Sequence, residues 1–222
     1  ENAKKIDAYI QTHPDADLSR KHPVTLQGKT RYVKVYRLPL DHIFYNIRNG
    51  RFASEYAELV TKQGRDLKPE DADDAKKIQK LLIDLDPKQS GLLEREIGKF
   101  GQKDPGVITV GGYVINGNRR MSVLQNLVDE GDSNFNFLDV ARLPAGVDAI
   151  DIWKIEAGIQ LSRPVQLNYG PINNLLKFKE GIEAGLKPTE IAKSLYGAFT
   201  EKEILEKLEQ LKLIARKWRG KK

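Results

Sequence analysis

Residues 107–130 read VITVGGYVINGNRRMSVLQNLVDE, and two different patterns of apolar residues follow one another in this stretch. β-Branched or aromatic residues fill Val107–Val110 and Tyr113–Ile115, on either side of the pair Gly111-Gly112. Such runs around two glycines predict two short strands joined by a tight turn. Beyond the second strand, apolar residues recur at helical spacing, at Met121, Leu124, Leu127 and Val128. The stretch therefore predicts two strands followed by a helix with one buried face.

The turn at residues 116–118 leads directly into the N-terminus of this helix. Free backbone N–H groups and the positive end of the helix dipole point at one spot there. Two permanently charged arginines lie at the same spot, which is typical of a phosphate-binding site. The alternative is a hairpin and helix whose arginines are solvated or paired with carboxylates. The candidate phosphate-binding residues are Gly111, Gly112, Asn116, Gly117, Asn118, Arg119 and Arg120.

Residues 114–124, VINGNRRMSVL, resemble the phosphate-binding box of the ParB/sulfiredoxin superfamily. ParB members of that family carry Gly-Glu-Arg-Arg in this box, immediately before a helix. The resemblance implies that the chain binds a nucleoside triphosphate, CTP or ATP. Asn118 stands where the family has glutamate, and an amide cannot act as a general base. We therefore expect nucleotide hydrolysis to be slow or absent.

A second resemblance lies earlier in the chain. Residues 32–38 alternate as a half-buried strand should, and residues 46–51, NIRNGR, follow. This segment is similar to the first ParB box, whose arginine faces the nucleotide phosphates in that family. Arg51 matches that arginine best and Arg48 second. On the residues alone, an ordinary Asn/Gly turn with surface arginines explains the segment equally.

Glu156 is the candidate metal ligand and catalytic carboxylate. Residues 155–160, IEAGIQ, resemble the glutamate-asparagine-x-glutamine segment that holds Mg²⁺ in ParB proteins. Ala157 replaces the asparagine, and one extra residue separates the glutamate from Gln160. A carboxylate is a suitable ligand for magnesium, which prefers hard oxygen atoms. The alternative for Glu156 is a surface carboxylate on a helix.

The predicted fold class is α/β (α+β), with a small mixed sheet and a ParB-like core followed by a helical segment. Residues 1–30 are interpreted as a polar N-terminal arm, with a short helix around residues 6–10. Residues 31–146 form the predicted nucleotide-binding core, with a helical insertion at about residues 52–90. Residues 147–222 form a predicted helical domain. The elements expected after the first strand are helices at 52–60, 71–85 and 92–99, a strand at 135–144, and helices at 149–158 and 169–184.

The C-terminal residues predict a pair of helices like a helix-turn-helix. Residues 185–195 give the first helix, and Thr200 with Glu203 forms a capping box for a second helix that starts at Glu201. That second helix carries an apolar stripe at Leu205, Leu208, Leu211 and Ile214. Its exposed positions are rich in carboxylates, which oppose the approach of DNA phosphates. Basic residues gather only in the tail, at Lys212, Arg216, Lys217, Arg219, Lys221 and Lys222.

Composition narrows the function further. The net charge of +6 favours an anionic partner, and with the basic tail it predicts weak, largely non-specific DNA binding. The absence of cysteine excludes disulfides, thiolate metal sites and the cysteine chemistry of sulfiredoxin. No apolar run reaches membrane-spanning length and no signal peptide is evident, so we expect a cytoplasmic protein without a membrane partner.

Three functional interpretations follow. The favoured one is a ParB-like, DNA-associated homodimer in which a bound triphosphate with Mg²⁺ regulates self-association on DNA. The second is an ATPase or small-molecule kinase on the same scaffold, with Glu156 or Asp41 as the catalytic carboxylate. The third is a protein-interaction module that keeps the fold and uses its apolar C-terminal helix as a docking surface.

Overall fold

The computed structural model describes residues 1–48, 50–161, 171–195 and 198–219. The described chain combines a mixed sheet with α-helices and ends in helices only, so the predicted fold class is confirmed. Contacts divide it into two compact units. The sheet unit comprises Glu1–Thr25, Lys29–Ile47 and Leu59–Val147. The helical unit comprises Leu26–Gly28, Arg48–Glu58 and Asp148–Lys222.

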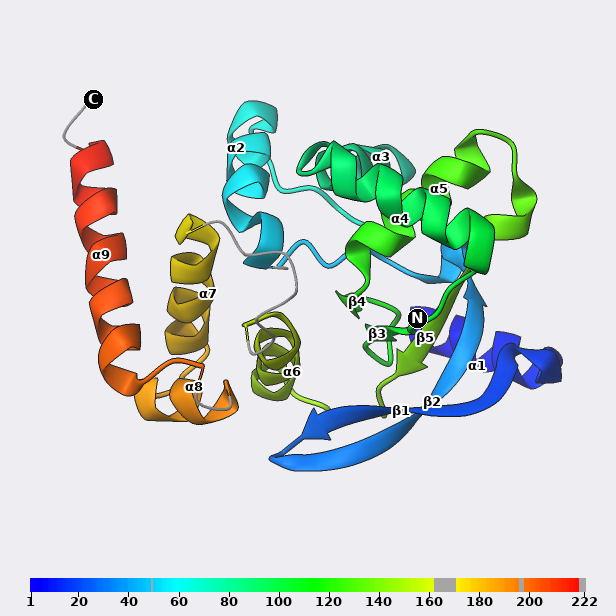
Figure 1. Cartoon of the computed structure of the whole chain (residues 1–222), viewed down its shortest axis with the longest axis horizontal. Helices are drawn as coiled ribbons and strands as arrows, with labels where there is room; N and C mark the ends of the chain where they lie inside the picture. The colour runs from blue at the N-terminus through cyan, green and yellow to red at the C-terminus, as the bar shows by residue number, and fades with distance from the viewer. Residues whose placement is uncertain (49, 162–170, 196–197, 220–222) are drawn as a thin grey trace. The chain divides into compact units, whose positions relative to one another are not determined.

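The described residues form a sheet with the strand order β1-β2-β5-β3-β4 (Figure 1). β5 pairs antiparallel with β2 and parallel with β3. β5 therefore occupies the centre of the sheet, although it is the last strand in the sequence. All four of its residues from 138 to 141 are buried, as expected for a central strand covered on both faces. The strands are β1 (Asp17–Leu26), β2 (Lys29–Pro39), β3 (Gly106–Ile108), β4 (Val114–Asn116) and β5 (Phe137–Arg142).

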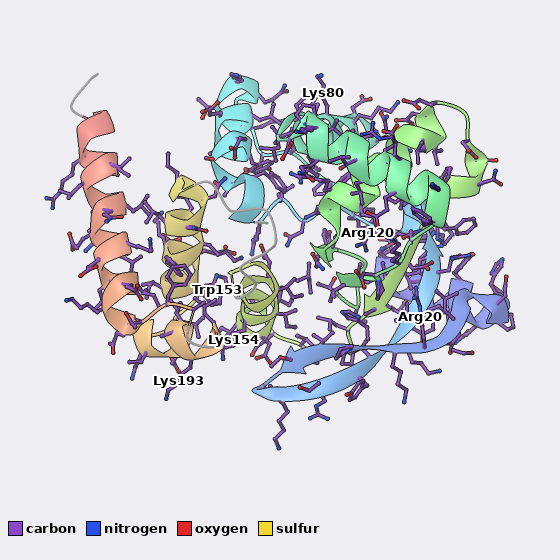
Figure 2. All side chains as sticks on the ribbon, viewed as in Figure 1. Arg20, Lys80, Arg120, Trp153, Lys154 and Lys193 are labelled. Carbon is purple, nitrogen blue, oxygen red and sulfur yellow. The ribbon has the colours of Figure 1, made fainter. Side chains whose placement is uncertain are left out.

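A buried carboxylate on β5 ties three strands together. Asp139 is 2% exposed, and its oxygens accept hydrogen bonds from Arg37 Nε on β2 at 2.8 Å and Arg20 Nη2 on β1 at 3.0 Å. Its backbone N–H donates to Gln102 Oε1 at 3.0 Å. Two guanidinium groups compensate the charge that burial would otherwise penalise. Arg20 is labelled in Figure 2.

Residues 1–30 differ from the polar arm expected there. Helix α1 (Asn2–Thr12) and the short turn η1 (Pro14–Ala16) lead into β1, the edge strand beside β2. Ile6 is fully buried, and Val24 and Leu26 are buried on β1. The less exposed positions Arg20 and His22 are polar and Pro23 follows them, so the sequence lacks the apolar alternation expected of a half-buried strand.

The expected helices of the insertion and core are confirmed. Asp71 caps α3, since its side chain accepts hydrogen bonds from the backbone N–H groups of Asp73 and Asp74. α3 and α4 pack against α5 (Figure 1). The helices are α2 (Ala53–Gln63), α3 (Ala72–Asp84), α4 (Pro87–Phe100) and α5 (Asn118–Asp129), with the short turns η2 (Leu40–His42), η3 (Gly50–Phe52) and η4 (Ser133–Phe135).

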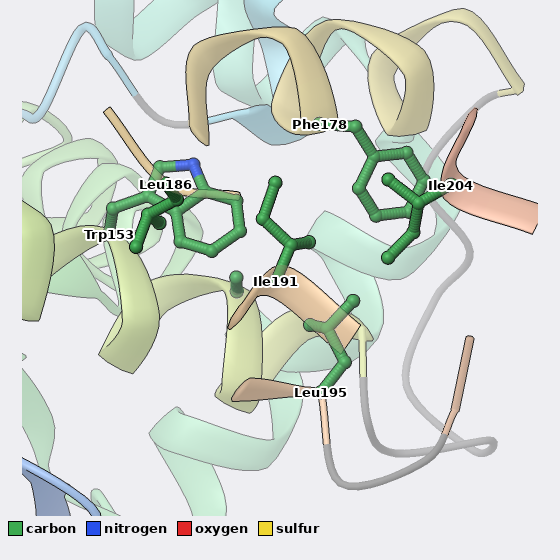
Figure 3. Close-up of a cluster of buried hydrophobic side chains, with 7 residues drawn as sticks. Trp153, Phe178, Leu186, Ile191, Leu195 and Ile204 are labelled. Atoms are coloured by element: carbon green, nitrogen blue, oxygen red, sulfur yellow. The ribbon is translucent and has the colours of Figure 1, made fainter. Parts of the chain in front are cut away.

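Among the described residues, four α-helices lie wholly within the helical unit: α6 (Ala149–Leu161), α7 (Pro171–Glu183), α8 (Pro188–Ser194) and α9 (Glu201–Arg219). Their shared core is drawn in Figure 3 and consists of Trp153, Ala157, Phe178, Leu186, Ile191, Leu195 and Ile204. The predicted capping box of α9 is confirmed, since Thr200 N donates to Glu203 Oε2 at 2.7 Å and Glu203 N to Thr200 Oγ1 at 3.2 Å. No helix in the described ranges is long and apolar enough to cross a membrane.

The buried stripe of α9 differs by one position from the expected one. Ile204 is fully buried, whereas Leu205 is 48% exposed. Leu208 is partly buried against the same core. The adjacent pair Ile204 and Leu205 offered two possible helix faces, and packing against α7 and α8 selected the face that contains Ile204.

Two helical glycines give a paired prediction. A Cβ at Gly181 on α7 would lie 2.7 Å from Trp153 Cζ2, whereas one at Gly98 on α4 would meet nothing within 4 Å. Gly181→Ala should lower stability by about 1–3 kcal/mol through overpacking. Gly98→Ala should raise it by about 0.5–1 kcal/mol, because alanine favours the helix. Thermal unfolding of both variants measures the difference, and a stabilising Gly181→Ala would contradict the close packing of α7 on Trp153.

Candidate functional site

The N-terminus of α5 has no side-chain cap. Gly117 is the N-cap residue, with a φ of 116° that favours glycine, and it has no side chain with which to cap the helix. The first helical bond runs from Met121 N to Gly117 O at 2.9 Å, so the preceding amides have no partner within the helix. The first turn contains no acidic residue but two arginines. Cations at the positive end of a helix dipole are unfavourable, and a bound anion would relieve this repulsion.

Asn118 joins the two sequence boxes. Its side chain is buried, and Oδ1 accepts a hydrogen bond from Asn46 N at 3.2 Å. Asn46 reaches this position because the chain before it runs alongside β4, where Phe44 N donates to Gly112 O and Val114 N to Phe44 O, both at 2.9 Å. The first box therefore begins at the N-terminus of the helix that the second box opens.

The amide nitrogen of Asn118 has no hydrogen-bond acceptor among the described residues. Asn118 is only 4% exposed, so water does not replace the missing partner readily. A buried donor left unsatisfied costs about 1–3 kcal/mol and calls for an explanation. An acceptor atom of a ligand bound at the N-terminus of α5 would supply one.

The two arginines of the box differ in their surroundings. Arg120, which is labelled in Figure 2, donates a hydrogen bond from Nη1 to the backbone oxygen of Asp104. Burial lowers the pKa of the Arg120 guanidinium, and the nearby carboxylates of Asp104, Asp139 and Glu96 oppose that shift. Arg119 is partly buried on the same first turn of the helix. Arg120 thus also anchors the loop before β3.

The glycine pair of the hairpin lies beneath α1. Asn2 Nδ2 donates to Gly111 O at 2.8 Å and to His42 O at 2.9 Å. Gly112 has a φ of 90°, and a Cβ there would lie 2.6 Å from His42 O and 2.8 Å from Asn2 Nδ2. Close packing therefore explains Gly112 without a ligand. Asn116 ends β4, and its backbone oxygen approaches Gly106 of β3.

The arginines of the first box belong to the helical unit. Arg48 is exposed, and Arg51 lies in η3, although its side chain is outside the described part of the structure. The structure thus places Asn46 of this box at α5 and assigns Arg48 and Arg51 to the other unit.

Glu156 is a buried residue instead of a surface carboxylate. It is 1% exposed, with Oε2 2.8 Å from Lys177 Nζ and Oε1 accepting a hydrogen bond from Gly50 N at 3.0 Å. Both oxygens therefore already have partners, one of them a cation. Among the described residues no group of three or more His, Cys, Asp or Glu side chains could hold a metal ion. The residues present do not fit a Mg²⁺ ion at Glu156, because the Lys177 ammonium occupies the place of a cation.

Lys177 and Asn46 have roles that sequence patterns did not indicate. Lys177 stands between Leu176 and Phe178, and a lysine between two apolar residues of a helix is the sequence signal that could have indicated a buried charge.

Asp41, the other carboxylate considered for catalysis, is largely exposed and pairs with His42 at 2.6 Å and Lys5 at 3.4 Å.

Comparisons with known proteins give a likeness to a solved structure. No protein-family model matches the chain, and no curated protein matches it. Among solved structures, the chain is similar to a Pnob8-like ParB-N domain in its C2221 crystal form, with a TM-score of 0.46 and 10% sequence identity. The alignment covers 78% of this chain and 66% of that chain.

The packing role of the hairpin glycines can be tested directly. Gly112→Ala should lower stability by about 2–4 kcal/mol, because the new Cβ meets a backbone oxygen and the φ disfavours L-residues. Gly111→Ala is the matched control, since a Cβ there has no neighbour closer than 3.9 Å, and it should change stability little. Denaturant titration of both variants decides the matter. Equal stabilities would show that α1 does not depend on Gly112.

Proposed function

We propose that this chain is a ParB-like nucleotide-binding protein that associates with DNA, and that a bound nucleoside triphosphate regulates its self-association as a homodimer. The triphosphate, CTP or ATP, binds with its phosphates at the N-terminus of α5. The single observation that carries the proposal is the buried Asn118 Nδ2, which has no acceptor within the described structure.

Three features support an anion as the ligand at α5. The helix N-terminus presents backbone N–H donors, Gly117 provides no side chain to cap them, and Arg119 adds positive charge to the first turn. Asn118 Nδ2 is a neutral donor within the same turn. Donors of both kinds suit phosphate oxygens, which accept several hydrogen bonds at once.

Binding is better supported than hydrolysis. Asn118 offers no general base, and Glu156 is enclosed by Lys177 and Gly50. Neither residue is therefore assigned a catalytic step, and no step involves a metal at Glu156. The chain is proposed as a nucleotide-responsive binding protein whose hydrolysis is slow or absent.

DNA association is proposed to be weak and largely non-specific. The outer charges of α9 pair with one another, Lys212 with Glu209 at 2.8 Å and Lys202 with Glu206 at 3.9 Å. Such a face has little net charge to offer phosphates and few free donors for base edges. The side chains of residues 217–222, which contain most of the basic tail, lie outside the described part of the chain.

The nucleotide site predicts a loss of affinity in one arginine variant. Arg119→Ala should weaken triphosphate binding by about 1.5–3 kcal/mol, the usual scale of a hydrogen bond to a charged group. Calorimetric titration of the four nucleoside triphosphates measures this. Arg31→Ala is the matched control, because Arg31 is an exposed arginine on β2 and its removal changes the net charge equally.

A second variant tests the observation that carries the proposal. Asn118→Asp keeps the size of the side chain and the acceptor for Asn46 N, but it replaces the Nδ2 donor with an oxygen that repels phosphate. Affinity should fall at least as far as in Arg119→Ala, with folding checked by circular dichroism. If both variants bind triphosphate with unchanged affinity, the nucleotide does not bind at the N-terminus of α5.

The DNA proposal predicts a salt dependence set by the tail. Deleting residues 216–222 removes five basic groups, namely Arg216, Lys217, Arg219, Lys221 and Lys222. The slope of log K against log salt should flatten by about 0.9 for each phosphate that the shortened tail no longer neutralises. Fluorescence anisotropy with a labelled duplex across a salt series measures it. Strong selection of one sequence from a random pool, retained after the deletion, would mean that α9 reads bases.

A further inference from the structure

A lysine is fully buried inside the helical unit. Lys177 on α7 has no exposed side-chain surface, and its Nζ lies 2.8 Å from Glu156 Oε2 and 2.9 Å from Glu180 Oε2. The same nitrogen lies 5.7 Å from the centre of the Trp153 ring. Lysine is almost never fully buried unless it is paired, because its charge loses the solvation of water. The burial of the Lys177 charge is therefore energetically costly and calls for a structural explanation.

The carboxylate partner extends the contact to a turn far away in sequence. Glu156 is also fully buried, and its second oxygen accepts the hydrogen bond from Gly50 N at 3.0 Å. Burial raises the pKa of Glu156, and the Lys177 charge opposes that shift. Gly50 begins η3, the short turn that contains Arg51 and packs against α7. One ion pair thus joins α6, α7 and the arginine-bearing turn within this unit.

A second contact fastens the same segment to α7. Asn173 is 4% exposed, and its Oδ1 accepts hydrogen bonds from Ser54 N at 3.0 Å and Ser54 Oγ at 2.9 Å. Phe52, between the two contacts, is fully buried. The segment from Gly50 to Ser54 is therefore held at both ends by polar bonds and in the middle by an apolar side chain.

We propose that Glu156 and Lys177 form a clamp that positions the turn η3 (Gly50–Phe52), with the Lys177 ammonium as the fixed counter-ion of Glu156 in place of a divalent cation. Glu156 is then a positioning residue and not a metal ligand. All of these contacts lie within the helical unit, so the clamp does not depend on the proposed function.

The chemistry of the site favours the ammonium over a metal ion. Magnesium requires near-octahedral oxygen ligands at about 2.0–2.1 Å and retains several waters, which a fully buried carboxylate does not accommodate. A divalent ion on Glu156 would also lie beside the Lys177 charge, and repulsion at such a distance is strong in a low-dielectric interior. Lys177 already supplies the positive charge that Glu156 requires.

Two double variants separate positioning from charge. Glu156→Gln/Lys177→Met removes both charges but keeps an acceptor for Gly50 N, whereas Glu156→Leu/Lys177→Met removes the acceptor as well. Replacing both members of a buried ion pair by neutral groups of similar volume is often tolerated, so both variants should fold. They differ at residue 156 alone, in the group that faces Gly50.

Amide hydrogen exchange of Gly50, followed by NMR, is the decisive measurement. Exchange should remain within about threefold of the wild type in the Gln variant and be faster by about tenfold or more in the Leu variant. The amide of Ile204, bonded to Thr200 O at 3.1 Å, reports general opening of the same unit and should exchange alike in both variants. Equal Gly50 exchange in the two variants overturns the clamp.

Mn²⁺ alone tests the metal alternative. Added to the wild-type chain without nucleotide, it should leave the amide resonances of Gly50 and Glu156 unbroadened. Broadening that the Glu156→Gln substitution abolishes overturns the assignment of Lys177 as the counter-ion.

Discussion

The central position of β5 is the constraint on which the sheet depends. Among the described residues it is the last of the sheet's five strands in chain order, yet it pairs with β2 on one side and β3 on the other. The two halves of the sheet therefore cannot join until residues 137–142 are in place. Asp139 reinforces the arrangement, because the arginines of β1 and β2 converge on a carboxylate that could not be buried alone. Through β3, the same strand fixes β4 and hence the point at which α5 begins.

The strand order of the sheet also determines which groups meet at the N-terminus of α5. Gly117 ends the sheet and opens the helix, so amides without a partner inside the helix follow directly after β4. The chain after β2 returns along β4 and brings Asn46 against Asn118. Two segments separated by 72 residues thus meet at a helix end that carries arginines and an unsatisfied buried amide. Positive charge and hydrogen-bond donors are concentrated there, and the first turn of the helix contains no acidic residue.

The helical unit contains a buried pair of opposite charges, Lys177 and Glu156. Lys177 and Glu156 lie beside an apolar core that contains Trp153 and Phe178, where each charge would be costly without the other. Glu156 also accepts a hydrogen bond from Gly50, so the buried ion pair holds the turn η3 in position. A carboxylate that resembled a metal ligand in sequence is therefore explained by an internal cation. The similarity of the residues at 155–160 to a known segment did not carry over to their surroundings.

The sequence by itself determined what depends on neighbours along the chain. Apolar periodicity located α5 and β2, and capping residues such as Asp71 and Thr200 located helix starts, because those interactions span only a few residues. Only the tertiary structure decided the roles of Gly112, packed against Asn2, and of Glu156, paired with Lys177 and Gly50. It also made β1 a strand of the sheet and chose Ile204 over Leu205 for the core of the helical unit. These outcomes depend on contacts between residues distant in the chain, and burial decides whether a charge is solvated or must find a partner inside.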